Sequence, residues 1–223
     1  MKRALVTGIT GQDGRFLAQF LAGKGYQVYG LIRGQNNPKG QLVVDETPSL
    51  ELVDGDLRDL SSLIAAVEQV QPDEVYNLGA MSFVKLSWSQ PELFAEITGL
   101  GVLRMLEAVR IVGGTQHNPV RFYQASSSEM FGKVRETPQT ELTPFHPRSP
   151  YGVAKVFGHH MTVNYRESYG MHASSGAPTA TRSASTRHRR RRCSARCVRR
   201  RRTSSRPSTR ARPTASPRSS ATT

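Results

Sequence analysis

Cysteine is scarce in this sequence, and long apolar runs are missing from it. The 223 residues include two cysteines, Cys193 and Cys197, so the first 192 residues can form no disulfide among themselves. A globular part without disulfides is typical of a reducing compartment, and we expect a cytoplasmic protein. No apolar run approaches the roughly eighteen residues of a membrane-spanning helix, and Met1–Arg3 leads into a short strand and not into a signal peptide. We therefore expect no membrane partner.

The last 47 residues lack acidic residues and lysine. Ala177–Thr223 contains fifteen arginines, whereas Met1–Gly176 holds sixteen basic and seventeen acidic residues, so the net charge of +14 arises from the last segment. That segment also lacks Leu, Ile, Phe, Tyr, Trp, Met and Gly. It can bury too little apolar surface to offset the entropy of ordering, so 177–223 is predicted to be disordered. Its two cysteines with His188 fall short of the usual four ligands, and we assign no metal site.

The first 176 residues alternate between strand and helix patterns. Strands are predicted over Arg3–Gly8, Tyr26–Ile32, Ser49–Asp56, Asp73–Ala80, Val120–Ser127 and His172–Gly176. Helices are predicted around Phe16–Leu21 and over Ser61–Val70, Pro91–Val112 and Tyr151–Tyr169. This alternation is typical of an α/β fold with a doubly wound, Rossmann-like parallel sheet, in which ligands bind at the carboxyl ends of the strands.

The turn "TGITGQDG" follows the first predicted strand and opens the first helix. Gly8, Gly11 and Gly14 let the backbone turn tightly and let a pyrophosphate approach the free N–H groups of the helix. The alternative is a plain glycine-rich turn, but the strand-turn-helix context favours a dinucleotide site. Arg33 stands at the end of the second strand, where an acid would bind a ribose 2′-hydroxyl and an arginine suits a 2′-phosphate. We therefore expect NADP in preference to NAD.

A second candidate site opens the helix "SPYGVAK". Tyr151 and Lys155 are four residues apart, so both project from one face of that helix. An ammonium near a phenol stabilises the phenolate and lowers the pKa of the tyrosine towards neutrality, which would make Tyr151 a usable base. The Tyr-x-x-x-Lys spacing is common by chance, so it indicates a catalytic site only in combination with the glycine turn that precedes it.

The segments "TGITGQDG", "LGAMS", "RFYQASSSEMFG", "PRSPYGVAK" and "VNYRESYGMHASSG" together closely resemble GDP-mannose 4,6-dehydratases. These enzymes belong to the extended short-chain dehydrogenase/reductase group. The resemblance runs from Met1 to about Gly176. It implies an enzyme that uses NADP as an internal hydride store and GDP-mannose as substrate. It would oxidise C4 of the mannosyl ring, eliminate water across C5 and C6 and reduce C6, giving GDP-4-dehydro-6-deoxy-D-mannose, a precursor of GDP-fucose.

The resemblance assigns four residues to catalysis. Tyr151 with Lys155 would take the C4 hydroxyl proton, and Lys155 would also hydrogen-bond the nicotinamide ribose. Glu129 matches the family's base for the C5 proton. Ser127 falls where the family usually has Thr, whose hydroxyl contacts the C4 oxygen. Apart from the resemblance, Glu129 reads as an exposed surface acid and Ser126–Ser128 as a polar strand end.

The resemblance also gives a set of cofactor-binding residues. These are Gly8, Ile9, Thr10, Gly11, Gln12, Asp13, Gly14, Arg33, Asp56, Leu57, Leu78, Gly79, Ala80, Met81, Ser82 and Lys155. Leu93 departs from the family, which usually has Tyr there, so one polar contact to the cofactor is expected to be lost. Trp88, His159 and His160 are expected to be packing or surface residues and are assigned no role.

The resemblance stops abruptly after Gly176, inside what should be a buried strand. The family continues with a segment near Asn-His-Glu-Ser-Pro-Arg and a smaller domain that binds the sugar nucleotide, and we expect this truncated chain to lack both and to be inactive. The arginine-rich segment is predicted to be a frameshift product of a high-GC coding sequence. The alternative is a basic arm that binds nucleic acid through phosphates. We disfavour it because the arm has no aromatic residues for base stacking and displaces elements that the fold needs.

Three functions therefore stay open at this point. The first is a GDP-mannose dehydratase by descent. The second is another sugar-nucleotide epimerase or dehydratase of the same group, such as a 4-epimerase, which has the same Tyr and Lys but needs no Glu129 for elimination. The third is a nucleic-acid-binding protein. The resemblance further implies a homo-oligomer formed through helices that include the one carrying Tyr151.

Overall fold

The computed structural model describes residues 1–34, 37–113 and 120–176 of the chain. The predicted disorder of 177–223, its cysteines and its arginines lie outside the described residues. In the described part, no helix is both long and apolar enough to cross a membrane.

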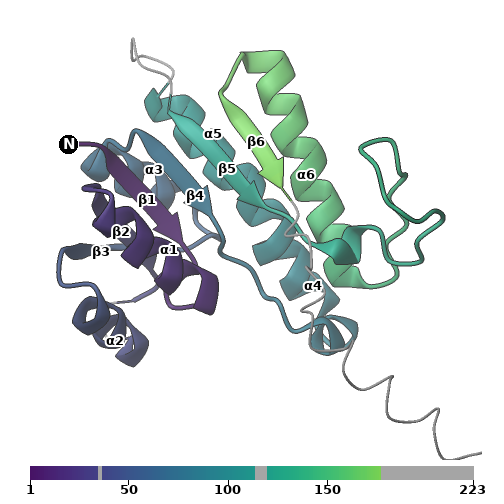
Figure 1. The fold of residues 1–223 in the computed structure, drawn as a ribbon, viewed down its shortest axis with the longest axis horizontal. Helices are drawn as coiled ribbons and strands as arrows, with labels where there is room; N and C mark the ends of the chain where they lie inside the picture. The colour runs from purple at the N-terminus through teal and green to yellow at the C-terminus, as the bar shows by residue number, and fades with distance from the viewer. Residues whose placement is uncertain (35–36, 114–119, 177–223) are drawn as a thin grey trace, which may run out of the picture. The chain divides into compact units, whose positions relative to one another are not determined.

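The described residues form a parallel six-stranded sheet in the order β3-β2-β1-β4-β5-β6 (Figure 1). The strands are β1 (Arg3–Thr7), β2 (Gln27–Ile32), β3 (Leu50–Asp54), β4 (Glu74–Asn77), β5 (Arg121–Ala125) and β6 (Ala173–Gly176). The longer helices are α1 (Gln12–Gly23), α2 (Pro38–Glu46), α3 (Leu60–Val70), α5 (Gly101–Gly113) and α6 (Pro150–Tyr169). Shorter elements are η1 (Val84–Trp88), α4 (Pro91–Phe94), η2 (Ala95–Leu100) and η3 (Ser128–Met130). This strand order is that of a doubly wound Rossmann-like sheet, which confirms the predicted fold class.

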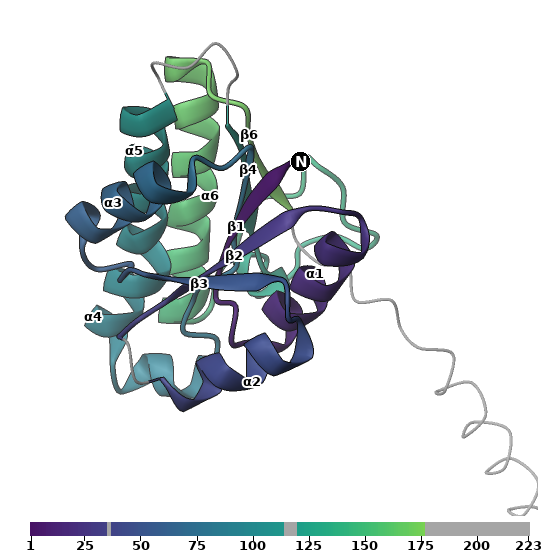
Figure 2. The same ribbon diagram turned by 90° about the vertical axis from the view of Figure 1, so that its left-hand side faces the viewer.

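Helices cover both faces of the sheet, and each face has its own hydrophobic core (Figure 2). The helices α3, α5 and α6 pack on one face, where Leu63, Met105 and Phe122 are almost fully buried. The helices α1 and α2 lie on the other face, where Ala18 and Val43 pack against β1 and β2. Because both faces are covered, the strands read as short apolar runs, which is the pattern that predicted them.

Two elements differ from the sequence-based prediction. The helix α2 was not predicted; its N-cap Asn37 accepts a hydrogen bond from the Lys39 N–H at 3.1 Å, and Pro38 opens the helix. The helix predicted over Pro91–Val112 is divided into α4, the π-helical η2 and α5. A close tertiary contact lies where η2 meets α5: a Cβ at Gly101 would lie 3.0 Å from the Leu57 side chain. Single π-helical turns often occur beside functional sites.

Candidate active site

The glycine turn joins β1 to α1 at the carboxyl end of the sheet. Gly8 has φ +69°, and a Cβ there would lie 2.8 Å from the backbone nitrogen of Gly79. A Cβ at Gly14 would lie 2.4 Å from the carbonyl oxygen of Gly8, so only glycine allows α1 to start this close to the turn. Gly11 is the N-cap of α1 and has no side chain to cap it. The first N–H groups of α1 are therefore open to an anion.

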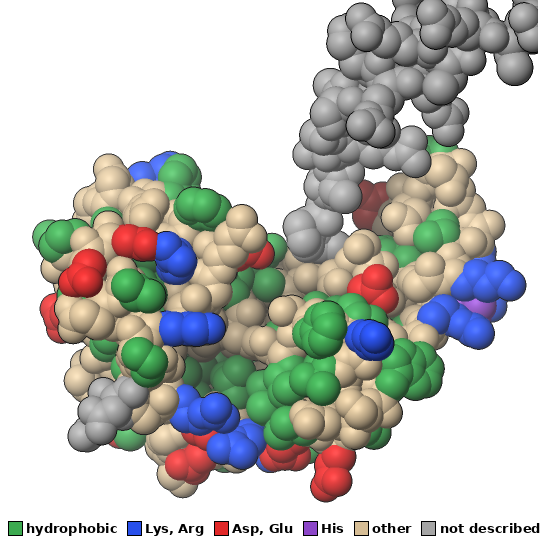
Figure 3. Space-filling view, turned by 90° about the horizontal axis from the view of Figure 1, so that it is seen from below, with side chains coloured by type: hydrophobic (Ala, Val, Ile, Leu, Met, Phe, Trp, Pro, Cys, Tyr) green, Lys and Arg blue, Asp and Glu red, His purple; other side chains and the backbone are tan. Residues whose placement is uncertain are grey.

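A cavity of about 450 Å³ lies over this turn and reaches the start of α6. It is lined by Gly8, Thr10, Gly11, Gln12, Asp13, Gly14, Lys39, Leu78, Ala80, Ser82, Ala125, Ser126, Tyr151 and Lys155. The view from below Figure 1 shows the surface hollowed between two lobes, with hydrophobic side chains gathered beside the hollow (Figure 3). The glycine turn and the Tyr-Lys pair, which are far apart in sequence, thus share one cavity.

A second cavity, of about 260 Å³, continues towards the ends of β2 and β3. It is lined by Thr7, Gly8, Thr10, Leu31, Ile32, Arg33, Asn37, Gly55, Asp56, Leu57, Ala80 and Ile97. The Arg58 guanidinium hydrogen-bonds the Asp56 carboxylate, 2.7 Å away at the closest. This bond, opposed by burial and aided by the charge of Arg33, lowers the pKa of Asp56. Arg33 and the carboxylate of Asp56, which Arg58 holds in place, therefore both line this second cavity.

Lys155 lines the first cavity but is itself buried. Its Nζ donates a hydrogen bond to the carbonyl oxygen of Ala125 at 2.9 Å, at the end of β5. Burial lowers the pKa of Lys155 to about 8. The lysine is therefore poised to gain or lose a proton near neutral pH.

The expected effect of Lys155 on Tyr151 is wrong for this structure. Burial raises the pKa of Tyr151, the hydrogen bond with Ser127 opposes the rise, and the charge of Glu129 adds to it. The Lys155 ammonium lies 5.9 Å from the centre of the Tyr151 ring and bonds a backbone carbonyl. Lys155 is not among the groups that shift the Tyr151 pKa, and desolvation of the phenolate by burial is the largest cause.

Ser127 and Glu129 lie beside the cavity and not in its lining. The Ser127 hydroxyl hydrogen-bonds Tyr151 and also accepts from the backbone N–H of Glu129 at 3.2 Å, as the N-cap of η3. Both residues are half-buried. The structure therefore brings all four residues assigned to catalysis to the junction of β5, η3 and α6.

Three of the residues expected to bind the cofactor line neither cavity. The side chain of Ile9 is 1% exposed and packs in the core against Gly30, so it faces away from both cavities. Gly79 is buried beneath the turn, where its N–H donates to Thr7 Oγ1 at 2.9 Å. Met81 is half-buried, and its backbone N–H donates to Thr98 on η2. These three support the turn or the strand edge from behind.

Three buried polar side chains form a row beneath the cavity that sequence reasoning missed. Thr7 Oγ1 donates to Asn77 Oδ1 at 2.6 Å, and Asn77 Nδ2 donates to Gln124 Oε1 at 2.7 Å. Gln124 Nε2 donates at 2.8 Å to the Ala125 carbonyl that also accepts from Lys155. The signal in the sequence was that each of three apolar strands has one polar residue at or near its carboxyl end. Only the strand order shows that the three are neighbours.

Lys39 was also missed. It lines the cavity over the glycine turn from the first turn of α2, a helix that was not predicted. The signal that could have found it was the Asn37-Pro38 pair, which is a typical helix start.

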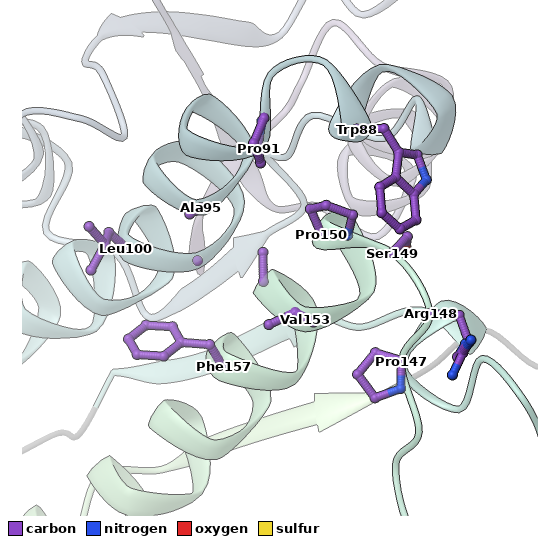
Figure 4. Close-up of a pocket in the computed structure, with 12 residues that line it drawn as sticks. Trp88, Pro91, Ala95, Leu100, Pro147, Arg148, Ser149, Pro150, Val153 and Phe157 are labelled. Carbon is purple, nitrogen blue, oxygen red and sulfur yellow. The ribbon is translucent and has the colours of Figure 1, made fainter.

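An apolar groove of about 750 Å³ runs between η1, η2 and α6, and its lining does not include Tyr151 or Lys155 (Figure 4). Trp88 and Pro91 lie on one side of it, and Val153 and Phe157 of α6 on the other. Trp88 is 65% exposed, so the largest side chain of the groove contributes little to the core.

The comparisons with known proteins agree with this arrangement. The family model described as GDP-mannose 4,6 dehydratase matches residues 5–203. The GDP-mannose 4,6-dehydratase of Yersinia enterocolitica is 52% identical over 183 residues, which covers 79% of this chain and 49% of the relative. The chain thus spans about half the length of the curated relatives it matches.

Solved structures of sugar-nucleotide enzymes share the fold. DesIV, a dTDP-glucose 4,6-dehydratase from Streptomyces venezuelae with NAD and TYD bound, has a TM-score of 0.68 and 26% identity, over 78% of this chain and 55% of that chain. A UDP-glucose 4-epimerase from Thermus thermophilus in complex with NAD has a TM-score of 0.64 and 30% identity, over 78% and 53%. The match of the family model over most of the residues shows that this chain belongs to the GDP-mannose 4,6-dehydratase family.

Proposed function

We propose that the protein is a GDP-D-mannose 4,6-dehydratase, which converts GDP-D-mannose to GDP-4-dehydro-6-deoxy-D-mannose and water. The observation that carries this proposal is the placement of Glu129 with Ser127, Tyr151 and Lys155 around one end of a cavity whose other end is the glycine turn. A carboxylate beside the Tyr-Lys pair is what an elimination requires and a simple 4-epimerisation does not.

The residues that line the two cavities fit a dinucleotide cofactor. The close approaches at Gly8 and Gly14 and the uncapped start of α1 suit a pyrophosphate, which Lys39 would help to neutralise. Arg33 at the end of β2 suits a 2′-phosphate, so we propose NADP as the cofactor, with Asp56 and Leu57 beside the adenine. Bound there, the nicotinamide would supply the acceptor and donor of hydride for oxidation at C4 and reduction at C6.

The side chains of this chain would move the protons. Tyr151 takes the proton of the C4 hydroxyl, and Ser127, which hydrogen-bonds Tyr151, orients the same oxygen. Burial raises the Tyr151 pKa, so the tyrosine needs a cation close to its hydroxyl to act as a base at neutral pH. Glu129 then removes the C5 proton, which the C4 ketone makes acidic, and passes it to the C6 hydroxyl, which leaves as water as the C5–C6 double bond forms. Return of hydride to C6 would be matched by a proton from solvent at C5.

The alternative is a sugar-nucleotide 4-epimerase, because the 4-epimerase from Thermus thermophilus shares this fold. A hybrid chain separates the two: residues 1–176 followed by the remaining half of the Yersinia relative, incubated with GDP-mannose and analysed by mass spectrometry. A dehydratase gives a keto-sugar lighter by one water, and an epimerase gives an isomer of unchanged mass. An isomer as the main product would contradict the proposed function.

We also propose that the complete fold forms a homo-oligomer through α6. The support is the groove around Trp88, Val153 and Phe157, whose exposed apolar side chains suit burial against a second copy. In the hybrid chain, Phe157→Glu should shift the molar mass measured by light scattering towards the monomer, whereas Phe20→Glu on the exposed face of α1 should not. An unchanged mass in Phe157→Glu would rule out this interface.

A further inference from the structure

The hydroxyl of Ser126 belongs both to the cavity and to the core behind it. Ser126 lines the cavity with Tyr151 and Lys155 and is 8% exposed. Its Oγ lies 2.5 Å from the Oγ of Ser175 on β6, which is the distance of a strong hydrogen bond between hydroxyls. The Ser126 hydroxyl therefore makes one hydrogen bond to Ser175 behind it, and it can make a further hydrogen bond to a ligand in the cavity.

Ser175 continues the chain to a histidine. Its Oγ lies 3.2 Å from Nδ1 of His159 on α6, and the His159 ring packs edge-on against Phe145 with centroids 5.0 Å apart. Burial, aided by the charges of His160 and Arg166 on the same helix, lowers the pKa of His159 below its ordinary 6.5. His159 is therefore neutral at pH 7 and becomes charged only in more acid solution.

The protonation of His159 Nδ1 sets the donor-to-acceptor direction of the hydrogen bonds that link it to the two serine hydroxyls. Each hydroxyl donates one proton, so an unprotonated Nδ1 accepts from Ser175, Ser175 accepts from Ser126, and the Ser126 oxygen offers only lone pairs to the cavity. A protonated Nδ1 reverses both bonds, and the Ser126 hydroxyl then donates into the cavity. Protonation of the whole imidazole enforces the second arrangement, because both ring nitrogens are then donors.

We propose that His159, acting through Ser175, determines whether Ser126 offers a hydrogen-bond acceptor or donor to the ligand bound beside Tyr151 and Lys155. His159 is in this sense a positioning residue, since it is two hydrogen bonds away from the ligand. The ligand it acts on is the nicotinamide cofactor, so the inference rests on the proposed function for the identity of that ligand. The hydrogen-bond chain itself rests on the described geometry alone.

The first test needs no cofactor. In the 223-residue chain labelled with ¹⁵N-histidine, the Nδ1 and Nε2 chemical shifts of His159 report its tautomer and its titration. Ser175→Ala and Ser126→Ala should each change the tautomer balance of His159. Ser128→Ala, which removes an exposed hydroxyl close in sequence to Ser126, should leave it unchanged. His159 shifts that Ser126→Ala does not move would overturn the proposal, whether or not the protein binds a cofactor.

The second test measures the affinity for NADPH by fluorescence between about pH 5 and pH 7, below the pKa of about 8 of Lys155 in the same cavity. The affinity of the unaltered chain should change about threefold to tenfold as His159 titrates, because one hydrogen bond to the ligand changes direction. Ser175→Ala and His159→Gln should remove this dependence. His160→Gln, which removes one charge that lowers the His159 pKa, should keep the dependence but move its midpoint to higher pH. A flat profile in the unaltered chain, or an unchanged one in Ser175→Ala, would also overturn the proposal. Absence of NADPH binding would count against the proposed function alone, and the ¹⁵N shifts would still decide the inference.

Discussion

Gly152 and Glu129 are in backbone contact. A Cβ on Gly152 would lie 2.6 Å from the carbonyl oxygen of Glu129, and the Gly152 N–H donates to Ser149 Oγ at 3.0 Å. The first turn of α6, which carries Tyr151, is thus packed directly on the short element η3, which carries the proposed base. Because the contact is between backbones, any side chain at position 152 must push the two elements apart.

Gly152→Ala should therefore destabilise the protein by about 1–3 kcal/mol, the usual cost of overpacking. The matched control is Gly23→Ala in the last turn of α1, where a Cβ would meet nothing within 4 Å. That change should be neutral or should stabilise by up to about 1 kcal/mol, because alanine favours the helix. Urea unfolding of both variants gives the comparison. Equal effects of the two substitutions would mean that η3 moves freely away from α6.

The buried Lys155 should make the stability depend on pH in a specific range. Its folded pKa of about 8 lies below the ordinary value of 10.5. Between these values the unfolded chain binds a proton that the folded chain has released, so the free energy of unfolding rises with pH there. The rise from this group is on the order of 3 kcal/mol, and below about pH 8 the full cost of the buried charge is present.

Lys155→Met should remove that rise and stabilise the protein at about pH 7, since methionine fills a similar volume without a charge. Urea unfolding at about pH 7, 8.5 and 10 measures it, with the exposed Lys133→Met as the control that should follow the unaltered chain. If Lys155→Met and the unaltered chain gave parallel stability curves, the lysine would not be buried as a charged group.

The fold and the glycine turn were predictable because their signals are local. Gly8 and Gly14 lie where the backbone requires glycine, and the apolar runs are short because the sheet is covered on both faces. The helix α2 gives a weak signal, since Gly40 and Val43 are its buried residues. The π-helical η2 depends on contacts such as Gly101 with Leu57, which no local pattern contains.

The sequence predicted which residues gather at the site, but not the pKa of Tyr151 or the buried polar side chains behind the site. Tyr151 and Lys155 share a helix face as their spacing predicts, yet the Tyr151 pKa is raised, with burial as the largest cause. The pairing of Asn77 with Gln124 depends on the register of β4 and β5. His159 was assigned no role because its partner on β6 becomes a neighbour only in the folded chain.

Arg33 should determine the choice between NADP and NAD. Arg33→Asp places a carboxylate where we expect the 2′-phosphate, so the ratio of NADP to NAD affinity should fall about tenfold to a hundredfold. Arg121→Asp at the amino end of β5 is the control, because the site lies at the opposite ends of the strands. Calorimetric titration with both cofactors measures the ratio. An unchanged ratio in Arg33→Asp would assign 2′-phosphate recognition to another residue, for example Arg58, which hydrogen-bonds Asp56 of the second cavity.

The 223-residue chain alone should have negligible dehydratase activity, although it carries Ser127, Glu129, Tyr151 and Lys155. It spans about half the length of its relatives, and we expect the cavity described above to hold the cofactor end of the site. Binding energy from the nucleotide part of a substrate aligns its reacting atoms, and about an ångström of misplacement can cost a hundredfold in rate. Substantial turnover of GDP-mannose by this chain would contradict the prediction.

The hybrid with the remaining half of the Yersinia relative should recover that alignment and the activity. Glu129→Gln keeps the shape of the side chain, but its amide cannot accept the C5 proton. In the hybrid this substitution should therefore abolish elimination. Glu141→Gln, which alters an exposed carboxylate between β5 and α6, should leave the rate unchanged. The sharpest measurement is exchange of the C5 proton with deuterated solvent in the product. Full incorporation of solvent deuterium at C5 by Glu129→Gln would assign the base to a different residue.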